Sequence, residues 1–162
     1  MPACPAPKHS HPWLRAACAA ALTLALLEAA PAHAQSGEAA LAAAAAEPGA
    51  VRTPSGLVFR SLRDGTGAQP AASDTVRVNY RGTLPDGREF DSSYKRGQPA
   101  SFALNRVIAC WTEGVQKMKV GGKAKLVCPP SIAYGDRGAG RDVPPGATLI
   151  FEVELLDVAP AR

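Results

Sequence analysis

The stretch that decides the fold reads Val107-Ile108-Ala109-Cys110-Trp111 and is followed directly by polar residues. An apolar run that ends in tryptophan predicts a short helix whose first turn forms the floor of a cavity. Aromatic residues lie on both sides of this stretch, so we expect the rest of the chain to wrap around it. Each aromatic residue taken alone fits an ordinary place in the hydrophobic core equally well. The flanking aromatic residues are Tyr80, Phe90, Phe102, Tyr134 and Phe151.

The first 34 residues have the pattern of a secretory signal peptide. They contain the basic residues Lys8 and Arg15, then an apolar run over 16–27, and then Ala32-His33-Ala34, which matches a small-x-small cleavage site. The apolar run is shorter than the ~20 residues that a membrane span requires. We therefore expect an exported protein without a membrane span, cleaved after Ala34.

Cleavage at this site would remove all three histidines of the chain, which are His9, His11 and His33. A mature chain without histidine has no Ser-His-Asp or Cys-His catalysis and no histidine metal site. The formal net charge is +4 and the charges are interspersed, so we expect no nucleic-acid-binding surface. We also expect no metal and no cofactor.

Two of the four cysteines, Cys110 and Cys128, lie beyond the expected cleavage site. An even number of cysteines in an exported protein favours a disulfide over two free thiols, and both states stay open at this point. The spacing is far from Cys-x-x-Cys, which argues against a thioredoxin-like redox role.

Residues 35–50 are rich in alanine and are interpreted as a flexible tether ahead of one domain over 51–160. Alanine favours helix, but a short helix with almost no apolar stripe has little to bury. Within the domain, alternation of apolar and polar residues predicts half-buried strands over 74–84 and 148–158. Pro85-Asp86-Gly87 predicts a tight turn after the first of them.

A loop that begins at Tyr134 and ends near Gly146 is rich in glycine and proline. Such a loop in a small domain favours a functional role over a simple connection. Several strands, most of them antiparallel, and one short helix over 108–118 predict an α+β domain with a twisted sheet folded over the helix. The expected pocket lies between the sheet and the helix.

Five short runs carry a more specific signal because of their order and spacing between residues 56 and 158. Together they resemble the FKBP-type peptidyl-prolyl cis-trans isomerases, in the exported, single-domain form of the periplasm. The resemblance implies an antiparallel sheet of five or six strands curled around one short helix. The runs are Val78-Asn79-Tyr80, Phe90-Asp91-Ser92-Ser93, Val107-Ile108 with Trp111, Ala133-Tyr134-Gly135, and Ala147-Thr148-Leu149-Ile150-Phe151.

The resemblance also implies an apolar cleft with Trp111 as the floor under a proline ring. Tyr134 and the backbone of Ile108 would form hydrogen bonds with substrate carbonyls. Asp91 would orient Tyr80 or a substrate carbonyl, although a turn-forming or ion-paired carboxylate is the plainer interpretation, and Arg96 is its candidate partner. The implied catalytic residues are Tyr80, Phe90, Asp91, Trp111, Tyr134 and Phe151, and the implied substrate-binding residues are Phe102, Val107 and Ile108.

The implied chemistry needs no nucleophile. Rotation about a peptide bond has a barrier of roughly 18–20 kcal/mol, which arises from amide resonance. The two isomers of an X-Pro bond differ by only about 0.5–1 kcal/mol, so the obstacle is kinetic. An apolar cleft that removes water from the amide and favours its twisted geometry would lower this barrier.

The resemblance implies a folding catalyst that acts on proline-containing unfolded or nascent exported polypeptides, with rapamycin-type macrolides as candidate ligands. The alternative is a non-catalytic chaperone or peptide-binding module that uses the same cleft. Longer periplasmic relatives carry a helical dimerisation segment where this chain has the alanine-rich tether, so we expect a monomer. Position 110 is commonly glycine in the family. Our hypothesis is that Cys110 at the helix start instead bonds Cys128 on the following strand.

Overall fold

The computed structural model describes residues 32–161. The expected signal peptide, residues 1–34, lies outside this range except for its last three residues, which begin helix α1 (Ala32–Ala45). Among the described residues, no helix has both the length and the apolar character to cross a membrane.

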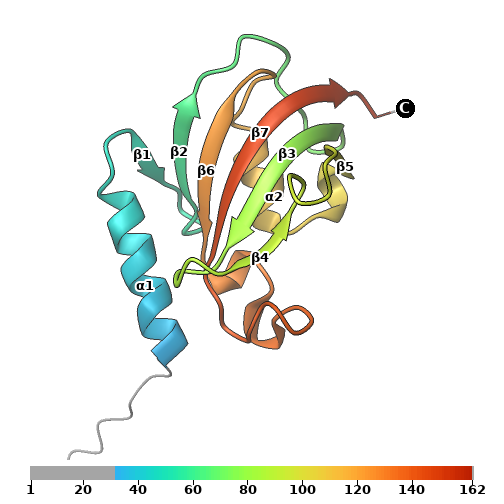
Figure 1. Cartoon of the computed structure of the whole chain (residues 1–162). Helices are drawn as coiled ribbons and strands as arrows, with labels where there is room; N and C mark the ends of the chain where they lie inside the picture. The colour runs from blue at the N-terminus through green and yellow to red at the C-terminus, as the bar shows by residue number, and fades with distance from the viewer. Residues whose placement is uncertain (1–31, 162) are drawn as a thin grey trace, which may run out of the picture.

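The body of the described chain is an antiparallel sheet in the strand order β1-β2-β6-β7-β3-β4, with β5 paired to β3 beyond the end of β4 (Figure 1). The strands are β1 (Ala50–Arg52), β2 (Val58–Arg63), β3 (Thr75–Thr83), β4 (Glu89–Ser92), β5 (Ala100–Ala103), β6 (Lys123–Cys128) and β7 (Leu149–Ala159). The helical elements after α1 are α2 (Ala109–Val115) and the 3-10 turns η1 (Leu104–Arg106), η2 (Pro130–Ile132) and η3 (Gly135–Arg137).

The predicted α+β class is confirmed, although residues 32–161 contain seven strands where five or six were expected. The short strand β1 extends one edge, and β4 and β5 pair with different halves of β3. The register shifts by one residue in β2 between Ser61 and Arg63, and again in β7, where Asp157 and Leu155 pair with the consecutive residues Arg77 and Val78 of β3. Because such bulges bend and twist a strand, they curl the sheet around α2.

The predicted alternation in the two longest strands is also confirmed. Strands β3 and β7 pair over nine residue pairs, and the burial of their side chains alternates along both strands. Their inward residues form one hydrophobic core with Trp111 and Val115 of α2. The inner face of the sheet therefore builds the cavity under α2, while the outer face is free for other contacts. The inward residues of β3 and β7 are Val76, Val78, Tyr80, Leu149, Phe151, Val153 and Leu155.

Helix α1 differs from the flexible tether expected over 35–50. Leu41 and Ala44 are only 2% and 5% exposed, and they pack with Val58 and Val127 in a second, smaller cluster. Val58 and Val127 are paired neighbours that alternate with inward residues, so this cluster lies on the outer face of the sheet. The helix itself has almost no apolar stripe. Its one leucine, Leu41, is enough to dock it, because the outer face of the sheet supplies apolar residues for that side chain to pack against.

Charged residues hold the end of α1 on the same face. Glu47, just after the helix, accepts hydrogen bonds from Lys125 of β6 and Arg60 of β2, both at 2.6 Å. The hydrogen bond from Lys125 is the larger cause, and that from Arg60 adds to it, so the pKa of Glu47 lies below its ordinary value. Helix α1 is thus joined to two strands by an apolar and an ionic contact.

We predict that Leu41→Ala lowers the free energy of unfolding by roughly 2 kcal/mol, since it removes a buried side chain from the contact between α1 and the sheet. The matched control is Leu62→Ala, because Leu62 is 41% exposed on β2, and its effect should stay within about 0.5 kcal/mol. Urea unfolding followed by circular dichroism gives both values. Equal effects of the two substitutions would show that α1 does not dock in solution.

Candidate functional site

A cleft of about 320 Å³ opens between α2 and the inner face of the sheet. All nine residues that the sequence marked as catalytic or substrate-binding line it, although their individual roles stay predictions. One further lining residue, Arg106, was not anticipated. The lining consists of Tyr80, Phe90, Asp91, Phe102, Arg106, Val107, Ile108, Trp111, Tyr134 and Phe151.

Trp111 lies at the base of the cleft and is only 5% exposed. Its ring meets Tyr80, Phe102 and Phe151 edge to face, with centroid distances of 5.1, 5.5 and 5.4 Å. Such aromatic pairs contribute about 0.5–1.5 kcal/mol each beyond the burial of their area. Three contacts from three different strands fix the orientation of the indole. Its buried Nε1 has no hydrogen-bond partner among residues 32–161.

Two glycines allow the close packing around this base. At Gly82 of β3, a Cβ atom would lie 2.6 Å from Cζ of Phe90, so only glycine lets the Phe90 ring lie across the strand. The Phe90 ring then contacts Phe151 edge to face at 5.5 Å. At Gly114 of α2, a Cβ atom would lie 2.8 Å from Cδ2 of Leu126, so glycine lets the helix approach β6.

Asp91 is held in a hydrogen-bonded group with Tyr80 and Arg96. The Tyr80 hydroxyl donates to Asp91 Oδ2 at 2.5 Å, and Arg96 Nη1 donates to Asp91 Oδ1 at 2.5 Å. Arg96 Nη2 also donates to the Tyr80 hydroxyl oxygen at 2.7 Å, and the Ser92 N–H donates to Asp91 Oδ1. The pairing of Asp91 with Arg96, left open by the sequence, is therefore present.

The pKa shifts in this group follow from the same contacts. Burial alone would raise the pKa of the Asp91 carboxyl, but hydrogen bonds from Tyr80 and Arg96 outweigh it, so the pKa lies below its ordinary value. Burial, and then the hydrogen bond to Asp91, raise the pKa of Tyr80. At neutral pH the carboxylate is therefore ionised and the phenol is neutral. Both are suited to orienting groups rather than to exchanging protons.

Two hydrogen-bond donors at the cleft have no partner in the described part of the chain. Tyr134 is 41% exposed between η2 and η3, and its hydroxyl makes no hydrogen bond there. Ile108 precedes α2, and its carbonyl accepts hydrogen bonds from the N–H groups of Trp111 and Thr112. Its own N–H makes no hydrogen bond with residues 32–161. The family resemblance implied that these two groups donate hydrogen bonds to substrate carbonyls, and that role stays a prediction.

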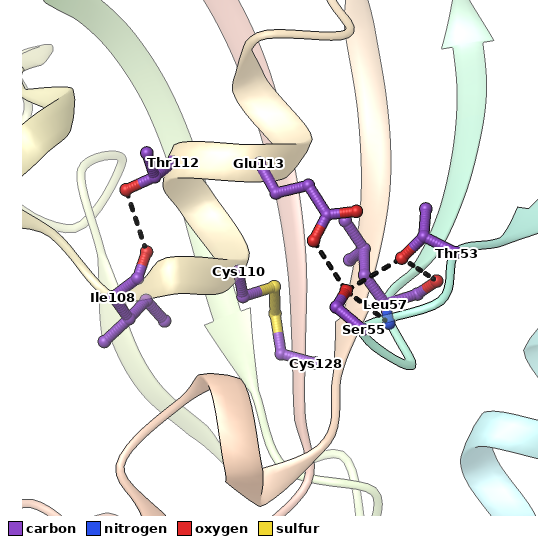
Figure 2. Close-up of a disulfide and its surroundings, with 8 residues drawn as sticks. All are labelled: Thr53, Ser55, Leu57, Ile108, Cys110, Thr112, Glu113 and Cys128. Atoms are coloured by element: carbon purple, nitrogen blue, oxygen red, sulfur yellow. Dashed lines mark hydrogen bonds between the residues drawn. A yellow bond between two sulfur atoms is a disulfide. The ribbon is translucent and has the colours of Figure 1, made fainter. Parts of the chain in front are cut away.

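A disulfide joins Cys110 in the first turn of α2 to Cys128 at the end of β6, so the hypothesis of a bond between them is confirmed (Figure 2). Both cysteines are fully buried, and their Cα atoms are 5.8 Å apart, within the usual range for a disulfide. Ser55 donates to Glu113 and ties the segment before β2 to the same helix (Figure 2). Because Cys110 precedes Trp111, the disulfide anchors the base of the cleft to the sheet.

Comparisons of the sequence and of the structure with known proteins point to the same family. A sequence model of the FKBP-type peptidyl-prolyl cis-trans isomerases matches residues 67–156. The curated relative FkpA of Escherichia coli K12 is 55% identical over 117 residues, which cover 72% of this chain and 43% of that protein. The chain therefore spans less than half the length of this relative.

Two solved structures share the fold. The crystal structure of FkpA from Escherichia coli aligns with a TM-score of 0.78 and 50% identity, over 80% of this chain and 61% of that one. A peptidyl-prolyl cis-trans isomerase from Pseudomonas syringae pv. tomato aligns with a TM-score of 0.74 and 40% identity, over 82% of this chain and 98% of that one.

We predict that Arg96→Gln raises the pKa of Asp91, because it removes a charged donor. A carboxyl whose folded-state pKa is lowered stabilises the fold above its unfolded pKa of about 3.9, and this contribution is lost as the pH falls through the folded-state pKa. In the variant the contribution should be smaller, and its loss should be complete at a higher pH, because the folded-state pKa lies closer to the unfolded one. Carboxyl ¹³C NMR titration measures the change. Arg81→Gln is the control, since Arg81 donates to Glu89 instead, and an unchanged Asp91 in Arg96→Gln would contradict the prediction.

We predict that replacing both cysteines, Cys110→Ala with Cys128→Ala, lowers the free energy of unfolding by roughly 3 kcal/mol, as the chain-entropy model gives for a loop of this size. Trp111 is the only tryptophan after residue 34, so its fluorescence reports unfolding at the base of the cleft. The control is wild-type protein with the disulfide reduced, which should behave like the variant. Two free thiols in protein isolated from an oxidising compartment would overturn the assignment.

Proposed function

Since the chain belongs to the FKBP-type peptidyl-prolyl cis-trans isomerase family, we propose that it accelerates rotation about X-Pro bonds in exported polypeptides and so acts as a folding catalyst. The observation that carries the proposal is the cleft itself. Its walls are aromatic, both oxygens of its one carboxylate accept hydrogen bonds, and two donors at it have no partner within residues 32–161. Uncatalysed X-Pro rotation takes tens to hundreds of seconds, which is slow enough to limit folding.

The geometry supports catalysis by desolvation and distortion. A proline ring resting on Trp111 would be surrounded by Tyr80, Phe102 and Phe151, which replace water around the amide with apolar surface. Water stabilises the planar, polar amide more than the twisted one, so its removal lowers the barrier. The Ile108 N–H and the Tyr134 hydroxyl would hold neighbouring carbonyls of the chain while the bond turns. No covalent bond is made or broken.

In the proposed reaction, Asp91 positions the Tyr80 ring and transfers no proton. Its carboxylate accepts from Tyr80, Arg96 and the Ser92 N–H. These hydrogen bonds fix the Tyr80 ring in the cleft wall and keep a full negative charge paired beside an apolar surface. Loss of the charge would leave Arg96 unbalanced and release Tyr80.

We also infer that the protein works in the periplasm after cleavage behind Ala34. The basic, apolar and small-residue pattern of the first 34 residues supports export. The disulfide supports an oxidising compartment, because such bonds are rare in the cytosol. Protein recovered from the periplasm, with Gln35 as its first residue and no free thiol, is the expected result of N-terminal sequencing and thiol titration.

The test is a protease-coupled isomerisation assay on a series of X-Pro tetrapeptides. The wild type should accelerate the cis-to-trans step, and Asp91→Asn and Trp111→Leu should each lower kcat/KM by about tenfold or more, a loss of at least ~1.4 kcal/mol of transition-state stabilisation. Arg77→Gln is the matched control, since Arg77 is exposed on β3 away from the cleft. Urea unfolding of each variant separates lost activity from lost fold.

Two further outcomes distinguish the proposal from its alternative. A rapamycin-type macrolide that occupies the cleft should inhibit the wild type competitively. A protein that accelerates no tetrapeptide, yet suppresses the aggregation of an unfolded client, would instead be a chaperone that uses the cleft for binding alone.

A further inference from the structure

A second hollow, of about 360 Å³, lies under the sheet at the end of α2 away from the cleft. Its apolar base is formed by Phe59 of β2, Met118 after α2 and Ala124 of β6. Phe59 is half-buried and packs against the main core. The volume of the second hollow lies at the lower end of the ~300–1,000 Å³ range of ligand-binding sites. The hollow shares no lining residue with the cleft.

The rim of the second hollow carries an excess of positive charge. Lys117 and Lys119 are exposed and make no ion pair with residues 32–161. Two further cations on the lining, Arg63 and Lys123, are already paired with glutamates of β7. The single acidic residue of the lining, Asp64, accepts a hydrogen bond from Ser61. Lys117 and Lys119 are therefore the lining cations without an ion pair among residues 32–161, and they outnumber the one carboxylate of Asp64.

The two hollows lie on either side of one helix. The cleft is lined from β3, β4, β5 and β7, and the second hollow from β2 and β6. In Figure 1, β2 and β4 stand toward opposite sides of the sheet, and α2 crosses behind it. The cleft is lined by residues at the start of α2 and the second hollow by residues just after its end, and the seven residues of α2 span roughly 10 Å along its axis. An extended chain at ~3.3 Å per residue covers this distance with only a few residues.

We propose that the second hollow binds a segment of an unfolded client chain in which an apolar residue is flanked by acidic ones. The apolar side chain enters between Phe59 and Met118, and the carboxylates meet Lys117 and Lys119. A segment a few residues from the proline can reach the hollow while the proline occupies the cleft. The inference rests on the proposed function, because the two hollows then hold two parts of the same client.

The chemistry favours this occupant over a purely apolar or purely charged one. An apolar base excludes water and contributes roughly 25 cal/mol per Å² of buried apolar area. Exposed lysines contribute mainly attraction at a distance, which steers an acidic segment toward the hollow and weakens as salt is added. A segment that has only the apolar residue would leave the two lysines without a partner, and a segment that has only acidic residues would leave the apolar base unfilled.

The test measures binding of a fluorescent, proline-free peptide containing Asp-Phe-Glu by fluorescence anisotropy. We expect wild-type protein to bind it, with affinity falling as salt rises. The double variant Lys117→Glu with Lys119→Glu should bind about tenfold more weakly or worse, because two attractions become repulsions. Arg77→Glu is the control, since it makes the same kind of charge reversal on β3 outside both hollows. A second peptide with lysines in place of the acidic residues should not bind.

A competition experiment separates this site from the cleft. An X-Pro tetrapeptide in excess should leave the labelled peptide bound, and the double variant should isomerise tetrapeptides at the wild-type rate. Equal binding to wild type and double variant, displacement by the tetrapeptide, or binding to anionic lipid vesicles but not to the peptide would each overturn the proposal. Absence of isomerisation by the wild type would count against the proposed function alone, because the binding readout does not depend on turnover.

Discussion

The contact between Trp111 and three aromatic rings is the interaction on which the site depends. Tyr80, Phe102 and Phe151 come from β3, β5 and β7, so one indole ring joins three strands to α2. Because edge-to-face pairs restrict both distance and angle, the rings hold the base of the cleft in one orientation. The disulfide at Cys110 acts on the neighbouring residue and resists separation of the helix from β6. The cleft is thus rigid at its base, although its rim is exposed.

The two faces of the sheet make different contacts. The inner face supplies apolar residues to the core under α2 and aromatic residues to the cleft. The outer face carries ion pairs between strands, such as that of Lys123 with Glu152, and receives α1 through Leu41 and Glu47. Changes on the outer face therefore alter stability without touching the cleft. This division follows from the period of two in β3 and β7, which sends alternate side chains to opposite sides.

The sequence was most informative where a repeating pattern of apolar residues reports which side chains are buried. Alternation predicted the two long strands, and the resemblance to the FKBP-type family implied which residues line the cleft. The docking of α1 escaped prediction because a single leucine makes no periodic signal, and its partners lie on strands far away in sequence. Strand β1 was missed because three residues are too few to show alternation. Arg106 was missed because an exposed arginine carries no pattern, and only the fold brings it to the rim.

The unpaired donors of Ile108 and Tyr134 bear on how long a chain stays in the cleft. Tyr134 is 41% exposed, so a carbonyl bound to its hydroxyl would replace a hydrogen bond to water, and the net gain would be small. Short segments should then dissociate quickly, since affinity differences appear mainly in the dissociation rate. The proposed catalysis of bond rotation would benefit from such brief residence, because each client chain would have to leave before the next could enter.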